Sequence, residues 1–157
     1  MAKRYYIAYG SNLNIEQMKF RCPTAKVVGI SEIPDYRLLF KGSQTGAYLT
    51  IEPYKGASVP VAVWEVKEDD ELSLDRYEGY PRFYYKAEMT LPVISIDGSR
   101  VKHLPVFVYI MHEDRPMGIP MQYYVDTCLE GYRAFSFDEE KLSDAIKLSL
   151  EECRHAK

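Results

Sequence analysis

The stretch RYYIAYGSNL, residues 4–13, decides how the rest of this chain can fold. Residues 5–9 are rich in side chains that favour strands, and Asn14 and the residues after it have the composition of a helix start. The stretch therefore predicts a strand, a tight loop at Gly10 and a helix. Glycine permits close approach and a helix start has unpaired amides, so such a loop can cradle an anion or an oxyanion. An ordinary strand-to-helix turn accounts for the local pattern equally well.

Length and composition predict a single domain spanning residues 1–157. Apolar residues make up 46% of the chain and charged residues 27%, which is ordinary for a globular protein and argues against disorder. The net charge of −3, without a basic run, excludes nucleic acid as a partner. No apolar stretch approaches the roughly 18 residues of a membrane span, and no signal-peptide core follows the first residues. We therefore expect a cytoplasmic protein with no membrane partner.

Tyrosine is unusually frequent, with 14 residues. A tyrosine ring packs against apolar groups while its hydroxyl needs a hydrogen-bond partner. Many tyrosines therefore favour a pocket with a polar floor or the interior of a mixed barrel, although ordinary packing could also absorb them. The three cysteines lie far apart and the three histidines lack metal-ligand spacing, so we expect neither disulfides nor a metal site.

The hydrophobic pattern predicts an α+β protein. The expected strands cover residues 25–33, 36–40, 48–51, 59–66, 82–96 and 100–111, with turns at 34–35 and 54–57. Asp97-Gly98 predicts a hairpin between the last two strands. Helices are expected after Asn14, before Gly79, and over residues 122–132 and 138–154. These elements predict a small mixed, mostly antiparallel sheet of about six or more strands, curled into a β-barrel with flanking helices.

The second informative segment is LDRYEGYPRFYY, residues 74–85. Glu78 lies between two tyrosines where a helix is expected to end, and Gly79 and Pro81 turn the chain after it. A carboxylate held in this way and partly removed from water has a raised pKa, which suits general acid–base catalysis. A solvated charge near a helix end is the simpler explanation of this segment taken alone.

The two segments become specific when they are taken together. Residues 9–13 (YGSNL), 21–23 (RCP), 36–38 (YRL) and 74–81 (LDRYEGYP), followed by Tyr84, occur in this order. In this arrangement the chain resembles the γ-glutamylcyclotransferase-like family, also called AIG2-like, over about residues 5–142. Either of the two longer motifs alone is a weak signal.

The resemblance implies a small β-barrel with flanking helices that acts as an enzyme without a cofactor. Members of the family take a small-molecule γ-glutamyl amine, let its own α-amino group attack the γ-carbonyl, and release 5-oxoproline and the free amine. The resemblance also implies that Glu78 is the catalytic acid–base. The residues implied to bind the γ-glutamyl substrate are Tyr9, Gly10, Ser11, Asn12, Leu13, Tyr84 and Tyr109.

This chemistry agrees with the residues present, because an attacking amine that belongs to the substrate needs no enzyme nucleophile. Glu78 could move the protons, and amides of the Gly10 loop could stabilise the oxyanion. Two other classes stay open, namely a non-catalytic small-molecule or partner-binding module that keeps the loop, and a structural interaction domain. We expect loops 41–46 and 112–120 to select the leaving amine. The sequence determines neither that amine nor the oligomeric state.

Overall fold

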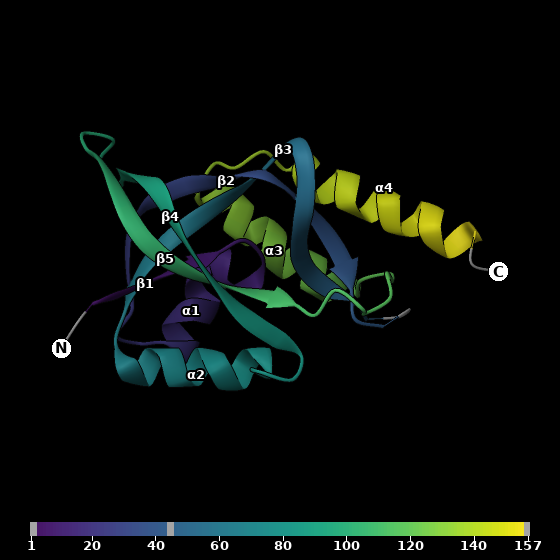
Figure 1. Cartoon of the computed structure of the whole chain (residues 1–157), viewed down its shortest axis with the longest axis horizontal. Coiled ribbons are helices and arrows are strands. Elements are labelled where there is room, and N and C mark those ends of the chain that lie inside the picture. Colours follow the sequence, from purple (N-terminus) through teal and green to yellow (C-terminus); the bar gives the residue numbers. More distant parts are fainter. Residues whose placement is uncertain (1–2, 44–45, 156–157) are drawn as a thin grey trace.

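A closed β-barrel forms the body of the protein (Figure 1). The structure is a computed structural model that describes residues 3–43 and 46–155. Within these ranges the strands are β1 (Arg4–Ala8), β2 (Lys26–Lys41), β3 (Tyr48–Val66), β4 (Tyr84–Ser95) and β5 (Val101–Met111). Their order around the barrel is β1-β3-β2-β4-β5; β1 runs parallel to β5, and the other pairs are antiparallel. The predicted fold, a mixed and mostly antiparallel α+β barrel, is confirmed.

The predicted number of strands was wrong, because two expected turns lie inside long strands. Asp35, with a φ of 58°, marks a bulge in β2 instead of its end, and the register shifts between Pro34 and Tyr36. Gly56, with a φ of 89°, lies within β3. The Gly56 amide donates to the Asp35 carboxylate at 2.9 Å, so the two irregular positions support each other across the ladder. Both strands therefore bend and continue, as a bulge allows.

Four helices flank the barrel in the described part of the chain, namely α1 (Ile15–Arg21), α2 (Glu68–Glu78), α3 (Gln122–Ala134) and α4 (Glu140–His155). At the start of α2, the Lys67 amide donates to the Asp70 carboxylate at 3.0 Å. The helix ends at Gly79, which adopts a left-handed φ of 64°. This end point confirms the predicted stop. No helix among the described residues is long and apolar enough to cross a membrane.

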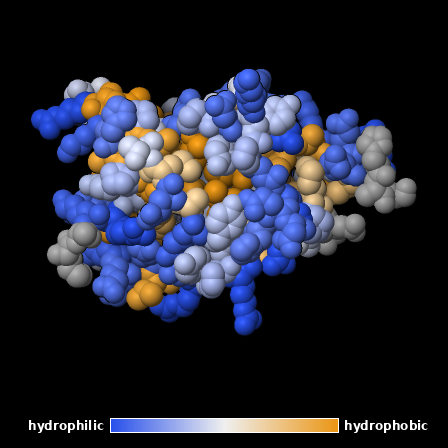
Figure 2. All heavy atoms as spheres, viewed as in Figure 1, coloured by the Kyte–Doolittle hydropathy of each residue, from blue (hydrophilic) through white to orange (hydrophobic). Residues whose placement is uncertain are grey.

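The hairpin predicted from Asp97-Gly98 is present between β4 and β5. The Ser95 carbonyl accepts a hydrogen bond from the Gly98 amide at 2.8 Å, which closes the turn. Apolar side chains gather on the surface at this tip (Figure 2), where Ile96 and Val101 are each 63% exposed. The interior of the barrel, by contrast, contains fully buried side chains such as Met111. The hairpin tip thus lies at one end of the barrel, and the start of β4 and the end of β5 lie at the other.

The loop after β1 is a short 3-10 helix, η1 (Ser11–Leu13), which packs directly on α3. Gly131 of α3 makes this possible, because a Cβ at that position would lie 2.5 Å from the Leu13 carbonyl carbon. The Asn14 side chain also ties the loop to α3 by donating to the Thr127 carbonyl at 3.1 Å and to Glu130 at 2.8 Å. Helix α3 therefore fixes the loop from behind.

Gly131→Ala should lower the stability of the protein, although alanine usually favours a helix by about 1 kcal/mol over glycine. The added methyl group must push the Leu13 backbone away, and overpacking of this kind costs about 1–3 kcal/mol. Denaturant unfolding measures the change. Ser143→Ala, at an exposed position in α4, is the control and should be neutral or slightly stabilising. A Gly131→Ala protein more stable than wild type would contradict the close packing.

Candidate active site

A cavity of about 580 Å³ opens where β4 begins and β5 ends. Eight of the 14 tyrosines line it, which agrees with the expected tyrosine-rich pocket. They come from every part of the chain: Tyr6, Tyr9, Tyr48, Tyr77, Tyr84, Tyr109, Tyr123 and Tyr124. The charged side chains that line the cavity are those of Arg21, Arg76 and Glu78. The cavity is therefore largely aromatic, with few charges.

The cavity brings together all but one of the site residues expected from the sequence. Glu78 faces the same space as Tyr9, Gly10, Ser11, Asn12, Tyr84 and Tyr109. Leu13 does not line the cavity, because its side chain is completely buried between the loop and α3. Its amide donates to the Gly10 carbonyl at 3.0 Å, so it is not free for a ligand. Leu13 therefore stabilises the loop by packing against α3 and does not line the cavity.

Hydrogen bonds fix the loop on its polar side. The Asn12 amide group donates to the Tyr6 hydroxyl at 3.0 Å and accepts a hydrogen bond from Arg21. The Arg21 guanidinium lies over the Tyr77 ring, 3.4 Å from its centroid, and the Tyr77 hydroxyl is 2.9 Å from the Ser11 hydroxyl. Among the described residues, the amides of Ser11 and Asn12 have no backbone partner. These two amides are the donors that the loop can offer to an oxyanion.

The hydroxyl protons of three expected substrate-binding tyrosines are already used within the protein. Tyr9 donates to the Tyr109 carbonyl at 2.8 Å, and Tyr84 donates to the Leu49 carbonyl at 2.7 Å. Tyr109 donates to the Asp75 carboxylate at 2.6 Å. A hydroxyl has a single proton, so these side chains meet a ligand with ring surface and oxygen lone pairs. The Tyr6 hydroxyl accepts from Asn12 and keeps its proton for another partner.

Glu78 is the last residue of α2, and its partly buried side chain lines the cavity. Burial raises its pKa to about 8, and the nearby positive charge of Arg21 opposes this rise only in part. No hydrogen-bond partner for the carboxylate lies within residues 3–43 and 46–155. Tyr77 and Tyr80, expected to exclude water, are both exposed. The enclosing group is instead formed by buried tyrosines. Burial and then the charge of Glu78 raise the pKa of Tyr6 and Tyr9, and burial, then Tyr9 and then Glu78 raise the pKa of Tyr84.

An aromatic wall, which the sequence did not reveal, completes the cavity. It consists of Tyr48, Phe83, Tyr123 and Tyr124. No residue of the loop 112–120 lines the cavity, in contrast to the expected selecting role of that loop. Instead, this loop forms hydrogen bonds with the end of β2; for example, the Gly118 amide donates to the Phe40 carbonyl at 3.1 Å. The loop 112–120 thus supports the end of the barrel from which the wall residues Tyr123 and Tyr124 follow. No local sequence motif marks the residues of the wall.

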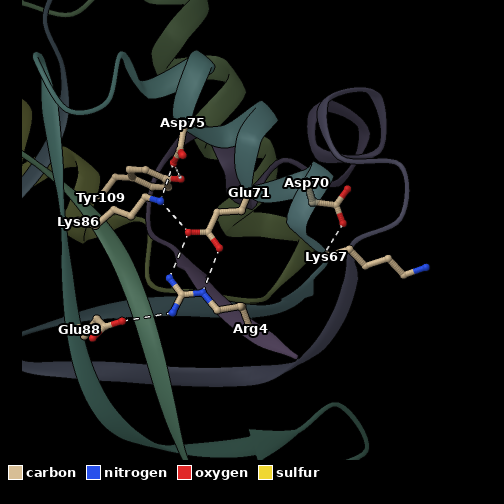
Figure 3. A network of polar contacts seen from close by, with 8 residues as sticks. All are labelled: Arg4, Lys67, Asp70, Glu71, Asp75, Lys86, Glu88 and Tyr109. Atoms are coloured by element: carbon tan, nitrogen blue, oxygen red, sulfur yellow. Dashed lines mark hydrogen bonds and ion pairs between the residues drawn. The ribbon is translucent and has the colours of Figure 1, made fainter. Parts of the chain in front are cut away.

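A network of ion pairs holds α2 against the barrel (Figure 3). Glu71 accepts from Arg4 of β1 at 3.0 and 3.1 Å and from Lys86 of β4 at 2.6 Å. Lys86 also pairs with Asp75 at 2.9 Å, and Asp75 accepts from Tyr109 of β5. Two acidic residues one turn apart therefore fasten α2 to three strands. Glu78 follows Asp75 by three residues, so this attachment also places Glu78.

The fold and the site together define a small closed-barrel protein in which an amide-bearing loop and a partly buried carboxyl group face one cavity. Residues 6–126 match the family described as "Gamma-glutamyl cyclotransferase, AIG2-like". The chain belongs to this family. A γ-glutamylcyclotransferase of Bos taurus is 29% identical over 132 residues, covering 79% of this chain and 68% of that protein. The Homo sapiens γ-glutamylcyclotransferase is 37% identical over 81 residues, which cover 47% of this chain and 43% of that protein.

Solved structures share the fold. A γ-glutamyl cyclotransferase structure superimposes with a TM-score of 0.77 and 24% identity over 92% of this chain and 86% of that one. A yeast γ-glutamyl cyclotransferase specific to glutathione gives a TM-score of 0.64 at 10% identity, over 97% of both chains. At these identities the likeness establishes the fold and nothing finer.

Lys86→Met should lower the free energy of unfolding by about 2 kcal/mol. The substitution leaves Asp75 without its cationic partner, and breaking a buried pair costs about 3–5 kcal/mol, reduced here because Lys86 is 17% exposed. Lys3→Met is the matched control, since it removes a pair to Glu65 on a lysine that is 69% exposed. Such a surface pair contributes about 0–1 kcal/mol. Equal losses in the two variants, measured by denaturant unfolding, would contradict a stabilising role of the network.

Glu78→Gln should be more resistant to heat than wild type at pH 8, and this advantage should vanish near pH 5. The pKa of Glu78 is about 8 in the folded protein, above its value of about 4.3 in an unfolded chain. The protonated carboxyl group therefore contributes stability that is fully present below about pH 4.3, is still mostly present near pH 5, and is lost progressively as the pH rises through about 8. Glutamine has no proton to lose. Thermal melts of both proteins across this range test the point, and a pH-independent difference would show that Glu78 does not titrate as stated.

Proposed function

We propose that this protein is a γ-glutamylcyclotransferase that converts a γ-glutamyl amino acid or γ-glutamyl amine into 5-oxoproline and a free amine. The observation that carries the proposal is the position of Glu78, whose carboxyl group has no hydrogen-bond partner among the described residues and a pKa of about 8, in the same cavity as the amide-bearing loop. Family membership supports the same reaction class. A pKa near neutrality suits a group that must both accept and donate a proton.

In the proposed reaction, the ionised Glu78 takes a proton from the substrate α-ammonium. The free α-amine then attacks the γ-carbonyl carbon, which forms the five-membered ring and puts a negative charge on the carbonyl oxygen. Holding the two reacting groups of one molecule together replaces the need for an enzyme nucleophile. As the bond from the γ-carbon to the leaving nitrogen breaks, Glu78 returns its proton to that nitrogen. The ionised Glu78 then takes the second proton from the attacking nitrogen, which leaves the neutral ring amide, and passes this proton to the freed amine, which departs as an ammonium. Bonds and protons balance, and Glu78 ends as it began.

The loop supplies the remaining stabilisation in this proposal. The amides of Ser11 and Asn12 are available to the oxyanion, and a donor placed in this way is typically worth about 3–4 kcal/mol. The Asn12 side chain cannot swing away, since Tyr6 and Arg21 hold it from both ends. Arg21 adds a positive charge on the same side, which suits the α-carboxylate of a γ-glutamyl group. The enclosing tyrosine rings keep water from the reacting atoms.

The alternative is a non-catalytic module that binds a small molecule or a partner through the same loop. Such a module would have no use for a carboxyl group kept buried without a hydrogen bond, because an unpaired buried acid costs stability. The raised pKa of Glu78 therefore favours the enzyme. The two classes differ in a measurable way, since only the enzyme releases 5-oxoproline.

Glu78→Gln should lower the rate of 5-oxoproline release from γ-glutamyl amino acids by about 10²- to 10⁴-fold. Glutamine keeps the shape of the side chain and cannot move the protons, so substrate binding, followed by calorimetry, should survive. The wild-type kcat/KM should rise with pH through about 8, because the ionised form of Glu78 starts the reaction.

Glu68→Gln is the control, since it makes the same change at an exposed position of the same helix. It should leave turnover within about twofold of wild type, in line with a surface change. A Glu78→Gln protein that keeps more than about a tenth of wild-type turnover, against the 10²-fold minimum loss, would exclude the acid–base role. Binding without turnover in the wild-type protein would support the non-catalytic module.

A further inference from the structure

We propose that the leaving amine is an α-amino acid with a large apolar side chain and no positive charge. This inference rests on the proposed function and concerns the part of the cavity that the γ-glutamyl group does not need. It is carried by the aromatic wall and by the sign of the charges that line the cavity.

The aromatic wall starts beside Glu78 and runs to the mouth of the cavity. Tyr84, whose pKa is raised by burial and by the charge of Glu78, packs on Phe83 with a centroid distance of 5.3 Å. Tyr48 contacts Phe83 edge-to-face at 6.5 Å and Tyr124 at 5.1 Å. Tyr48 is 42% exposed and lines the cavity, so part of its ring is open to a ligand. The wall offers a continuous apolar surface that leads away from the reacting atoms.

Apart from the charged residues of α2, polar groups of the cavity come from elements other than those of the wall, namely η1 and α1. Ser11 and Asn12 belong to the loop, and Gln17 and Arg21 follow it on the adjoining helix. The γ-glutamyl group carries an ammonium and a carboxylate, so it fits this polar side and not the aromatic one. The leaving group must then extend along the aromatic wall. A large apolar side chain gains most from that surface, because it is removed from water there.

The charges of the cavity select against a cationic leaving group. Arg21 and Arg76 line the cavity, and Glu78, the single lining carboxylate among the described residues, is occupied by the reaction. Arg115 lies behind the wall, 4.8 Å from the Phe83 ring centroid, where its charge opposes the approach of a second cation to that ring. An ammonium on the leaving group would therefore meet positive charge without a carboxylate partner.

The same charges accept a carboxylate. Arg76 has no ion-pair partner in residues 3–43 and 46–155, and it lies in the last turn of α2 beside the cavity. A free α-carboxylate on the leaving amine gives this guanidinium a partner. An amino acid with an apolar side chain therefore suits both the wall and the charge.

The test compares three substrates on the wild-type enzyme, namely γ-glutamyl-phenylalanine, γ-glutamyl-glycine and ε-(γ-glutamyl)-lysine. The phenylalanine compound should have a kcat/KM at least about tenfold above that of the glycine compound, mainly through a lower KM, as apolar contacts in a pocket discriminate by 10-fold or more. The lysine compound, which keeps an ammonium group, should be the poorest of the three.

Tyr48→Ala should lower kcat/KM for γ-glutamyl-phenylalanine about tenfold and leave the glycine compound within about twofold. Tyr54→Ala is the matched control, because Tyr54 is a half-exposed tyrosine of the same strand that stacks on Arg37 at 4.2 Å and does not line the cavity. It should change neither substrate.

Several results would overturn the inference. One is equal kcat/KM for the phenylalanine and glycine compounds in wild type, and another is a preference for the lysine compound. An equal loss for both substrates in Tyr48→Ala would show general damage instead of a lost contact. If Tyr48→Ala does not fold, the ranking of substrates by the wild-type enzyme still decides the question. Absence of 5-oxoproline from all three compounds would instead remove the proposed function itself, which keeps the two failures distinct.

Discussion

The attachment of α2 to the barrel through Glu71 and Asp75 is the constraint on which the site depends. The two carboxylates are four residues apart, so they point from the same face of the helix toward Arg4, Lys86 and Tyr109 (Figure 3). Each of these partners comes from a different strand. Partly buried charges are costly unless every one of them is paired, so the arrangement tolerates little sliding or rotation of the helix. A helix fixed in this way carries its last residue, Glu78, to one place.

Neighbouring carboxylates on α2 acquire opposite properties from their surroundings. Burial acts to raise the pKa of Glu71, but hydrogen bonds from Arg4 and Lys86 outweigh it, and the pKa is lowered. Glu78 experiences burial with only the more distant Arg21 to oppose it, and its pKa rises to about 8. The same residue type on one helix therefore becomes a structural anion in one place and a titrating acid in the other. The difference lies in whether paired cations outweigh the effect of burial on each carboxylate.

Local sequence patterns were enough to predict much of this structure. They failed where contacts between residues far apart in the sequence determine the conformation. Turn-forming residues close together in the sequence are enough to predict three features, namely the loop at Gly10, the hairpin at Asp97-Gly98 and the end of α2 at Gly79. The continuity of β2 and β3 does not follow, because the bulge at Asp35 is stabilised by an amide 21 residues later. The place of Glu78 in one site with the loop was suggested by the paired motifs. The lack of a hydrogen-bond partner for its carboxyl group among the described residues, and the aromatic wall, depend instead on packing between separate elements.

The two sides of the cavity are built largely by different parts of the chain, although α3 carries two wall tyrosines and also packs on the loop at Gly10. The polar side comes from η1 and α1. Glu78 comes from α2, which the ion-pair network holds in place. The aromatic wall is held by the loops behind it, where the buried Lys41 pairs with Glu52 at 2.6 Å and donates to the Glu113 carbonyl at 2.7 Å. Changes in those loops can move the wall without touching Glu78 or the loop at Gly10. Under the proposed function, the choice of leaving amine can therefore change through residues that never contact the substrate, since packing transmits their shifts to the wall.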